Sequence, residues 1–489
     1  MEKLVACVIG SGIGGLASAL RLTAKGYSVT VLEKSGAPGG KVAQFNEAGY
    51  RFDMGPSLFT LPYLVDELFE LFGKKRDDYL KVMTLPMSCN YFFPDGLNLK
   101  AWSDKAWFLD EVEKTGVKRE KVVQYLEKQS FLYDHAAEVF LFRSLHKPST
   151  YTSEAGRKGM RALPHMDAFT SMHQRNVRCF GDSRLVQLFD RYATYNGSDP
   201  YRAPATLNMI AHLEHNTGAY FPENGLFGII LALKKLADEV GVRFFFNTEV
   251  TGLLTKGRQV TGVKTMDSVY PADLVVNNTD ITLFYRDIMP NARMFRPLMK
   301  RERSSSALIF YWGVRTMSAL HVHNILFSAD YKAEFDGLFK TKVLADDLTV
   351  YIFISKKVVE TDAPDGCENW FVMVNAPENV GQDWEEETQK ARQIALRKIK
   401  SALDLTIEPL IDSERVITPQ DIENRTGSVN GSLYGHSSNS PLSAFRRHPN
   451  FSRKYKNLFF TGGSVHPGGG IPLCLASAKI VDALIEEGK

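Results

Sequence analysis

Three glycines near the start of the chain have the spacing of a phosphate-binding turn. Gly10, Gly12 and Gly15 form a G-x-G-x-x-G pattern, with Gly14 as a further small residue and Glu33 downstream. The first glycine permits a tight turn, the second lets the backbone approach a pyrophosphate, and the third lets a helix pack on a strand. The helix amides then face the anion, and a carboxylate such as Glu33 accepts hydrogen bonds from ribose hydroxyls. The pattern predicts a dinucleotide site and leaves NAD and FAD both open.

Two short segments after the acid extend this predicted site. Gly39-Gly40-Lys41 places a second glycine pair and a cation where the chain could wrap around a larger dinucleotide. Gly55-Pro56-Ser57 is a turn whose glycine and proline restrict the backbone, and it can bring amides and a hydroxyl against a cofactor. The alternatives are a solvated surface lysine at Lys41 and a plain loop at residues 55–57.

A glycine-rich loop near the C-terminus has residues that could face the other end of a cofactor. Residues 458–460 read as a strand, residues 461–470 as the loop, and Pro472 stands where a first helical residue would. A helix that begins there points free amides and its positive end at whatever lies in front of it. In a flavoprotein that would be the pyrimidine edge of the isoalloxazine. His466, within the loop, is a candidate acid or base, or a residue that shapes the loop.

The elements that must position these residues are the strands and helices of a parallel sheet. Continuous apolar runs predict buried strands, and apolar residues at helical spacing predict the helices between them. The expected helices cover residues 16–25 and 226–240, and the expected strands cover 4–9, 29–32, 242–246, 250–254, 260–264, 271–280 and 458–460. We therefore expect an α/β, Rossmann-like cofactor domain that is discontinuous, formed by residues 1–80, 220–300 and 415–489.

The rest of the chain divides into a sheet-based part and a helical part. Expected strands over 307–314, 348–355 and 370–375, a helix over 384–403 and a hairpin over 91–102 assign residues 81–104 and 301–414 to a second domain that faces the substrate. Residues 105–219 read as mostly helical, rich in aromatic and basic residues. We interpret them as a lid or membrane-associating insertion.

Composition bounds the class of protein. With 489 residues the chain exceeds one ordinary core, and 44% hydrophobic with 24% charged residues is typical of a soluble globular protein. A net charge of +3 is too small to argue for a nucleic-acid partner. The five cysteines are scattered and never spaced as C-x-x-C, which predicts reduced thiols in a cytosolic protein and no metal site.

Membrane association is a separate question. No apolar stretch is long enough to cross a bilayer, and the N-terminus does not resemble a signal peptide. Basic residues outnumber acidic ones between Arg143 and Arg178, which fits either attraction to anionic lipid or an ordinary solvated face. We expect a cytoplasmic protein that lies peripherally on the inner membrane face.

Five motifs together resemble bacterial carotenoid desaturases of the phytoene desaturase type. Residues 191–201 (RYATYNGSDPY) further resemble the branch that dehydrogenates hydroxylated carotenoids, the hydroxycarotenoid 3,4-desaturases or methoxyneurosporene dehydrogenases. The family motifs are the N-terminal glycine turn with Glu33, Gly39-Gly40-Lys41, Phe52-Asp53-x-Gly55-Pro56-Ser57, Phe221-Pro222-Glu223-Asn224-Gly225, and Gly463-Ser464-Val465-His466-Pro467-Gly468-Gly469-Gly470-Ile471-Pro472.

The resemblance implies non-covalent FAD, a polyene substrate and a fold similar to monoamine oxidases. Carried over by position, the cofactor-binding residues are Gly10, Gly12, Ile13, Gly14, Gly15, Glu33, Lys34, Gly40, Lys41, Gly55, Pro56, Ser57, Val250, Gly463, Ile471, Pro472 and Leu473. The polar residues proposed as catalytic in the family do not align with this sequence. Asp134 and Arg143, in the helical region, and His466 are the candidates that remain.

The implied reaction is transfer of a hydride from an allylic carbon to flavin N5, followed by loss of a proton from the adjacent carbon. A conjugated polyene delocalises the developing cation, so we expect no strong protein base. The electrons would pass to oxygen or to a membrane quinone. The narrower expectation is 3,4-desaturation of a 1-hydroxylated carotenoid such as 1'-hydroxy-γ-carotene. The alternatives are a multi-step phytoene desaturase, an amine oxidase-like flavoenzyme and a non-enzymatic prenyl-binding protein of the Rab-escort type.

Overall fold

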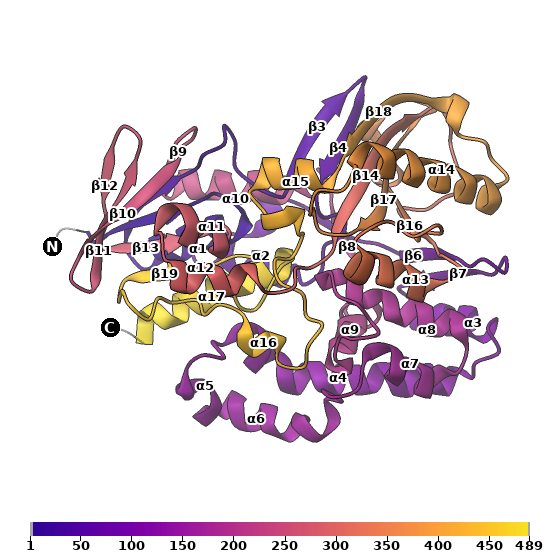
Figure 1. The fold of residues 1–489 in the computed structure, drawn as a ribbon, viewed down its shortest axis with the longest axis horizontal. Helices are drawn as coiled ribbons and strands as arrows, with labels where there is room; N and C mark the ends of the chain where they lie inside the picture. The colour runs from indigo at the N-terminus through magenta and orange to yellow at the C-terminus, as the bar shows by residue number, and fades with distance from the viewer. Residues whose placement is uncertain (1–2, 488–489) are drawn as a thin grey trace.

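The computed structural model describes residues 3–487, and its central layer is a five-stranded parallel sheet (Figure 1). The strands lie in the order β19-β13-β1-β2-β9, and each neighbouring pair is parallel. Their bounds are β1 Val5–Ile9, β2 Ser28–Leu32, β9 Arg243–Phe245, β13 Leu274–Asn277 and β19 Leu458–Phe460. Three separate parts of the chain therefore build one sheet.

The side chains of β1 point alternately into two different cores, as expected for a strand. Ala6 and Val8 pack with the helices α1 Ile13–Ala24, α10 Phe227–Glu239 and α17 Ile471–Glu487. Cys7 and Ile9 pack on the opposite side, against a second layer. That layer consists of the antiparallel strands β10 Val250–Lys256, β11 Gln259–Thr265 and β12 Val269–Pro271 with the helices α11 Ile281–Leu283 and α12 Ala292–Met299. Burial on both faces explains the continuous apolar run in the sequence.

A seven-stranded sheet forms the second half of the molecule. Its order is β18-β14-β17-β16-β15-β6-β7, and only the β15–β6 pair is parallel among these described strands. The bounds are β6 Met87–Phe92, β7 Asn98–Trp102, β14 Ser306–Val314, β15 His323–Leu326, β16 Val350–Ile354, β17 Glu368–Ala376 and β18 Ile411–Ile417. Leu308 and Phe310 pack in the same core as α14 Trp384–Leu403. Ala307 and Ile309 face the other way, toward the first sheet.

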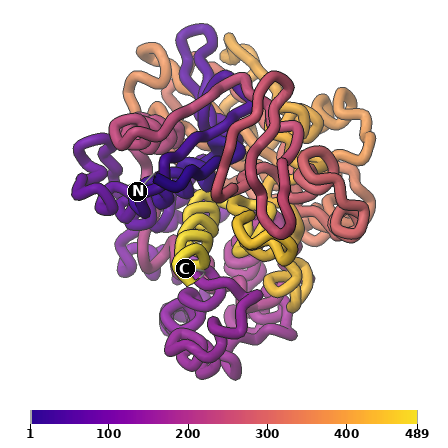
Figure 2. Tube along the Cα trace, turned by 90° about the vertical axis from the view of Figure 1, so that its left-hand side faces the viewer, coloured from indigo at the N-terminus to yellow at the C-terminus, as the bar shows by residue number. Residues whose placement is uncertain are grey.

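A lobe of helices lies below both sheets in Figure 1, and Figure 2 shows it projecting from the rest of the molecule. Its longer helices are α3 Lys105–Glu113, α4 Arg119–Phe142, α6 Glu154–Ala162, α7 Met172–Phe180 and α8 Ser183–Asp190, joined by α5 Pro148–Thr152 and α9 Ile210–His215. Met172, Phe180 and Leu185 of this lobe share a core with Tyr91 and Leu99 of the seven-stranded sheet. The lobe is thus fixed to the sheet by apolar packing.

Short elements connect these layers. They are β3 Ala43–Glu47, β4 Tyr50–Met54, α2 Tyr63–Glu70, β5 Val82–Thr84, β8 Tyr220–Pro222, α13 Tyr331–Asp336, α15 Pro419–Thr426 and α16 Ser443–Arg446. Within residues 3–487, none of the helices has the length and hydropathy that a bilayer crossing requires.

Most of the expected elements are confirmed, with three differences. The single strand expected over 271–280 is instead the end of β12 and the separate strand β13, which belong to different sheets. The helix expected over 384–403 has those bounds, and the hairpin expected over 91–102 joins β6 to β7. The last helix begins at Ile471, so Pro472 is its second residue rather than its first. The expected domain boundary between residues 414 and 415 falls inside the edge strand β18, which pairs with β14. The charged residues of β18 do not have the apolar pattern of a buried strand, so the sequence did not predict it. The division into domains otherwise stays a prediction.

Candidate functional site

A cavity of about 1140 Å³ is lined by residues of both sheets and of the helical lobe. Every residue predicted to bind the cofactor lines this cavity except Gly15. The cavity reaches from Glu33 at the end of β2 to Leu473 in the first turn of α17 and extends along the seven-stranded sheet. It therefore joins the predicted dinucleotide site to a second, largely apolar space.

The N-terminal turn is as tight as its glycines predict. Gly10 has φ of 92°, in the left-handed region that glycine favours. A Cβ atom on Gly15 would lie 2.1 Å from the carbonyl oxygen of Gly10. Gly15 therefore allows helix α1 to pack against strand β1, and it does not itself contact the cofactor site. Cβ atoms on Gly12 and Gly14 would lie 2.9 Å and 2.8 Å from the Asn278 side chain. The first turn of α1 therefore brings glycine backbone to the cavity, together with the side chain of Ile13.

Glu33 lies at the ribose end of the predicted site. Its carboxylate accepts hydrogen bonds from the Ser11 amide at 2.7 Å, the Ser11 hydroxyl at 2.8 Å and the Ser35 amide at 2.9 Å. The Glu33 side chain is only 7% exposed, and these bonds hold it in place and satisfy its buried charge. Lys34 and Val250 line the same cavity, with Val250 at the first position of β10. A carboxylate has further acceptor capacity for ribose hydroxyls.

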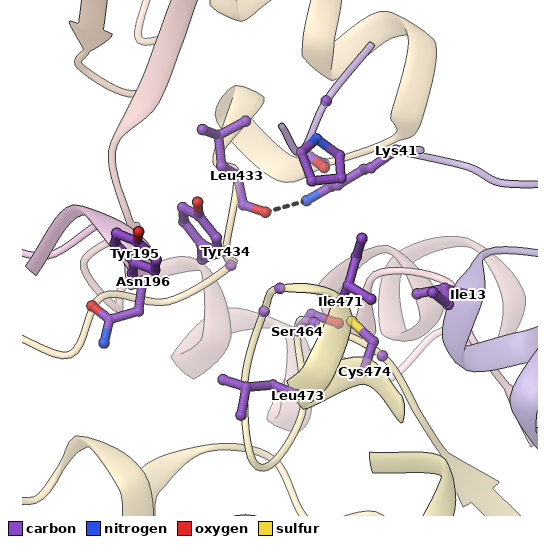
Figure 3. Close-up of a pocket in the computed structure, with 18 of the residues that line it drawn as sticks. Ile13, Lys41, Tyr195, Asn196, Leu433, Tyr434, Ser464, Ile471, Leu473 and Cys474 are labelled. Atoms are coloured by element: carbon purple, nitrogen blue, oxygen red, sulfur yellow. Dashed lines mark hydrogen bonds between the residues drawn. The ribbon is translucent and has the colours of Figure 1, made fainter. Parts of the chain in front are cut away.

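Lys41 is fixed in the middle of the cavity wall. Its Nζ donates hydrogen bonds to the carbonyl oxygens of Ser432 at 3.2 Å and Leu433 at 2.6 Å (Figure 3). Burial lowers the pKa of Lys41, although the nearby Asp280 opposes this effect. The interpretation of Lys41 as a solvated surface lysine is therefore wrong. The chain turns tightly beside it, since a Cβ atom on Gly55 would lie 2.2 Å from the Lys41 carbonyl oxygen.

The C-terminal loop and the start of α17 close this part of the cavity. Gly463, Ile471, Pro472 and Leu473 line it, and Figure 3 shows Ile471 and Leu473 at the helix start. Tyr434 packs on the loop so closely that a Cβ atom on Gly469 would lie 2.9 Å from the Tyr434 Cα. The backbone N–H groups of this first turn have no carbonyl oxygen of a preceding helical turn to bond, so they are available to a ligand.

These features fit FAD. The glycine backbone of the N-terminal turn suits a pyrophosphate, Glu33 suits a ribose, and the start of α17 suits the end of a flavin where negative charge develops. The residues that would hold the cofactor are those predicted, with Gly15 shaping the turn. Among residues 3–487 there is no group of three His, Cys, Asp or Glu residues able to hold a metal ion.

None of the three catalytic candidates lines the cavity. Asp134 is exposed on α4, because the helix turns Tyr133 and Phe140 to the cavity instead. The Arg143 side chain is exposed and pairs with Glu138 at 3.1 Å. His466 is fully buried, its Nε2 lies 2.9 Å from the Arg143 carbonyl oxygen, and burial lowers its pKa to about 3. The structure thus gives His466 the role of shaping the loop.

A buried charged pair that sequence reasoning did not assign lies where the helical lobe meets the sheet. Arg191 Nη2 lies 2.7 Å from Oε1 and 3.0 Å from Oε2 of Glu214, and both residues line the cavity. Ser88 donates to Glu214 at 2.9 Å, Tyr195 also donates to it, and Arg191 Nε donates to Tyr91 at 2.7 Å. Burial raises the pKa of Glu214, but the charge of Arg191 together with His215 and the hydrogen bonds from Tyr195 and Ser88 outweighs burial and lowers the pKa to about 2. The pair is charged and internally satisfied.

A second polar chain starts at the predicted cofactor residue Ser57. The Ser57 and Tyr351 hydroxyls lie 2.7 Å apart, and the Tyr351 hydroxyl lies 2.7 Å from His323 Nδ1. All three residues line the cavity. Burial lowers the pKa of His323 to about 4, so the ring is neutral. The sequence signals for this region were the turn that ends at Ser57 and the resemblance of residues 191–201, and neither pointed to His323 or Tyr351.

The remainder of the cavity wall is mostly apolar, although it includes Asn196, Asn375 and Arg447, and it opens at the helical lobe. Ile309, Phe371 and Met373 line it from the seven-stranded sheet, and Phe140 and Leu213 line it from the lobe. Leu163 and Phe445 line the cavity and are also 55% and 43% exposed, so they mark its entrance. The site combines a dinucleotide cradle, a largely apolar channel and a buried polar cluster around Arg191 and His323.

A family model for flavin-containing amine oxidoreductases matches residues 13–481. The chain is 46% identical to the 1-hydroxycarotenoid 3,4-desaturase of Flavobacterium sp. (strain P99-3), over 99% of each chain. It is 31% identical to the 4,4'-diaponeurosporene oxygenase of Staphylococcus haemolyticus (98% of this chain, 97% of that one). It is 30% identical to the phytoene desaturase of Phycomyces blakesleeanus (97% and 83%).

Solved structures show the same fold at low identity. An oxidoreductase from Methanosarcina mazei has a TM-score of 0.66 at 15% identity, over 99% of this chain and 100% of that one. Putrescine oxidase with bound putrescine has a TM-score of 0.63 at 12% identity, over 99% of each chain. The predicted FAD-binding α/β fold of the monoamine oxidase type is confirmed.

Proposed function

The chain belongs to the flavin-containing amine oxidoreductases, and from this premise we propose that it is an FAD-dependent carotenoid desaturase. It introduces a C=C bond into a carotenoid during carotenoid biosynthesis, and the substrate is a 1-hydroxylated carotenoid such as 1'-hydroxy-γ-carotene, oxidised at C3–C4. The observation that carries the proposal is the cavity that joins the dinucleotide cradle to a long apolar channel. The full-length similarity to a 1-hydroxycarotenoid 3,4-desaturase supports the narrower substrate.

FAD, when bound, supplies the hydride acceptor. The protein's own residues hold the substrate and exclude water from the reacting bond. Ile309, Phe371 and Met373 offer an apolar surface along which a rod-shaped polyene can align, and alignment of the reacting groups lowers the barrier. Loss of the second hydrogen as a proton needs no strong base, because the polyene spreads the positive charge. This agrees with the position of Asp134, Arg143 and His466 away from the cavity.

The cavity entrance supports a peripheral position on a membrane surface. Met160, Leu163 and Phe169 are 61%, 55% and 93% exposed, and Leu163 lines the cavity. Three exposed basic residues, Arg157, Lys158 and Arg161, lie on α6 with Met160, directly before Leu163. We call Met160, Leu163, Phe169 and these three cations the entrance face. Exposed apolar side chains flanked by cations suit an anionic lipid surface, from which a carotenoid can enter.

The electrons leave the protein to oxygen or to a membrane quinone. A position at the inner membrane face of the cytoplasm would give access to both. Anaerobic turnover with a soluble quinone, compared with turnover in air, separates the two acceptors.

The amine oxidase alternative is disfavoured by a buried cation. Arg447 lines the cavity, is 5% exposed and donates to the Ser438 hydroxyl at 3.1 Å, while its Nη1 has no partner in the described chain. Burial lowers its pKa to about 10, which leaves it charged at neutral pH. A protonated amine would meet this unneutralised charge in a region of low dielectric, whereas a neutral polyene would not.

The test is the pigment formed in cells that express this chain beside either phytoene or 1'-hydroxy-γ-carotene. A red-shifted product lighter by two hydrogens, from the hydroxylated substrate only, supports the proposed 3,4-desaturase. Colour formed from phytoene would instead make the protein a multi-step phytoene desaturase. A purified protein that is colourless after FAD is supplied would favour the prenyl-binding alternative.

A further inference from the structure

The cavity wall carries several polar side chains, and one hydrogen-bonded group of them includes the predicted cofactor residue Ser57. We call Ser57, Ser88, Arg191, Glu214, His323 and Tyr351 the polar end. All six line the cavity, and none of them is needed to hold the dinucleotide cradle except the predicted cofactor residue Ser57. A purely hydrocarbon substrate would gain nothing from these groups, since burying polar atoms without partners is unfavourable.

Tyr434 shows how near the polar end is to the C-terminal loop. A Cβ atom on Gly197 would lie 2.9 Å from the Tyr434 ring, and one on Gly469 would lie 2.9 Å from the Tyr434 Cα. One residue therefore spans the gap between the segment that contains Arg191 and the loop before α17. Figure 3 shows Tyr195 and Asn196 of that segment beside Tyr434, across the cavity from Leu473.

Most of the polar end is already paired. Glu214 accepts hydrogen bonds from Arg191, Ser88 and Tyr195, and the remaining N–H groups of Arg191 donate to tyrosine hydroxyls. The exception is His323, whose Nε2 has no hydrogen-bond partner within the described chain although the residue is only 3% exposed. Its other ring nitrogen is bound to the Tyr351 hydroxyl, and Tyr351 to Ser57. His323 is therefore the group of the polar end with unused hydrogen-bonding capacity; elsewhere in the cavity wall Asn196 Oδ1 and Arg447 Nη1 also have no partner in the described chain.

An alcohol is a suitable partner for this nitrogen. If Tyr351 donates to Nδ1, then Nε2 carries the ring hydrogen and donates; if Nδ1 donates to Tyr351, then Nε2 accepts. A hydroxyl group can both donate and accept, so it pairs with either tautomer. A hydrocarbon end group pairs with neither and leaves Nε2 unsatisfied.

The position of the hydroxyl in the proposed substrate agrees with this location. In a 1-hydroxylated carotenoid a single methylene carbon separates the carbon that bears the hydroxyl from the C3–C4 bond. A group that binds this hydroxyl must therefore lie near the reacting bond rather than at the far end of the channel. The link from His323 through Tyr351 to Ser57 connects it to a predicted cofactor residue.

We propose that His323 binds the tertiary hydroxyl of the substrate through Nε2 and so makes the protein selective for hydroxylated carotenoids. Tyr351 and Ser57 fix the imidazole, and the Arg191–Glu214 pair keeps the surrounding wall in position. The assignment rests on the proposed function, because it concerns the substrate of that reaction.

The experiment compares two substrates that differ in the hydroxyl alone, 1'-hydroxy-γ-carotene and 1',2'-dihydro-γ-carotene, with FAD-loaded protein. For the wild type, kcat/KM should favour the hydroxylated substrate by about tenfold or more, the size of one buried hydrogen bond. His323→Leu should reduce this preference to within about threefold, chiefly through the hydroxylated substrate. His323→Gln, which keeps a polar group, should retain part of it. FAD content and melting temperature check that each variant is folded.

The matched control is His321→Leu, two residues away and outside the cavity wall, which should leave the preference unchanged. An unchanged preference in His323→Leu, or an equal loss on both substrates, would overturn the assignment but not the proposed function. A wild-type protein that oxidises neither carotenoid would overturn the proposed function itself and the assignment with it.

Discussion

Arg191 and Glu214 form a buried ion pair, with Nη2 of Arg191 2.7 Å from Oε1 of Glu214 and side chains that are 7% and 2% exposed. They come from η3 Arg191–Asn196 and from α9, and they fix the helical lobe to the sheet through Tyr91 and Ser88. Both charges are far from solvent, so each depends on the other for its neutralisation.

Removing one partner of this pair should destabilise the protein strongly. Glu214→Leu leaves the Arg191 guanidinium buried and unpaired, which costs about 3–5 kcal/mol. The double variant Arg191→Met/Glu214→Leu should recover most of this loss, because no charge remains buried. Urea unfolding followed by tryptophan fluorescence measures both. A double variant no more stable than Glu214→Leu would contradict the argument.

Acid should begin to destabilise the protein at pH values well above those at which carboxyl groups are protonated, because several buried histidines are neutral. Burial lowers the pKa of His436 and of His466 to about 3, from about 6.5 in an unfolded chain. The unfolded state then binds more protons, so the stabilisation is complete above pH 6.5 and is lost as the pH falls toward 3. At pH 5 the loss is roughly 2 kcal/mol for each histidine.

This pH dependence can be measured by urea unfolding at pH 7.5 and pH 5. His436→Asn should lose less stability between the two pH values than the wild type does, by roughly 2 kcal/mol. His165→Asn, at an exposed position, is the control and should follow the wild type. Identical pH profiles for wild type and His436→Asn would show that His436 is not the neutral buried group described.

Gly15→Ala should abolish FAD binding. The added methyl would lie 2.1 Å from the Gly10 carbonyl oxygen, so strand β1 and helix α1 could not keep their turn. The matched control is Gly36→Ala, where the nearest atom, on Asn247, would be at an ordinary 3.4 Å. Flavin absorbance per mole of purified protein is the measurement. Wild-type flavin content in Gly15→Ala would contradict the packing described.

The entrance face should control binding to lipid. Met160→Ser/Phe169→Ser removes two exposed apolar side chains, and we expect at least about a tenfold weaker association with vesicles of phosphatidylglycerol and phosphatidylcholine. Met266→Ser, 79% exposed but on the loop between β11 and β12, is the matched control. Vesicle flotation at low and high salt also tests the contribution of the cations, which salt should weaken. If the entrance-face variant and the Met266→Ser control bind vesicles equally well, the entrance face is not the lipid-binding surface.

The sequence alone was sufficient for the cofactor half of the protein. The turn from Gly10 to Gly15 and the strand ending at Glu33 are contiguous, so backbone sterics and residue spacing fix their geometry locally. The resemblance extended this to the segments around Lys41, Ser57 and Ile471, and the cavity brings them together. The catalytic candidates failed for a local reason too: at Asp134 the helix points to solvent, while its neighbour Tyr133 points to the cavity.

Only the tertiary structure decided the polar end. Ser57 and Tyr351 are 294 residues apart, and Ser88 and Glu214 are 126 apart, yet each pair is hydrogen-bonded. A periodic pattern tells which face of a strand or helix is buried, but not which distant element covers that face. The sequence therefore determined the cofactor turn and the class of fold. The folding of the helical lobe onto the seven-stranded sheet decided which polar groups meet in the cavity.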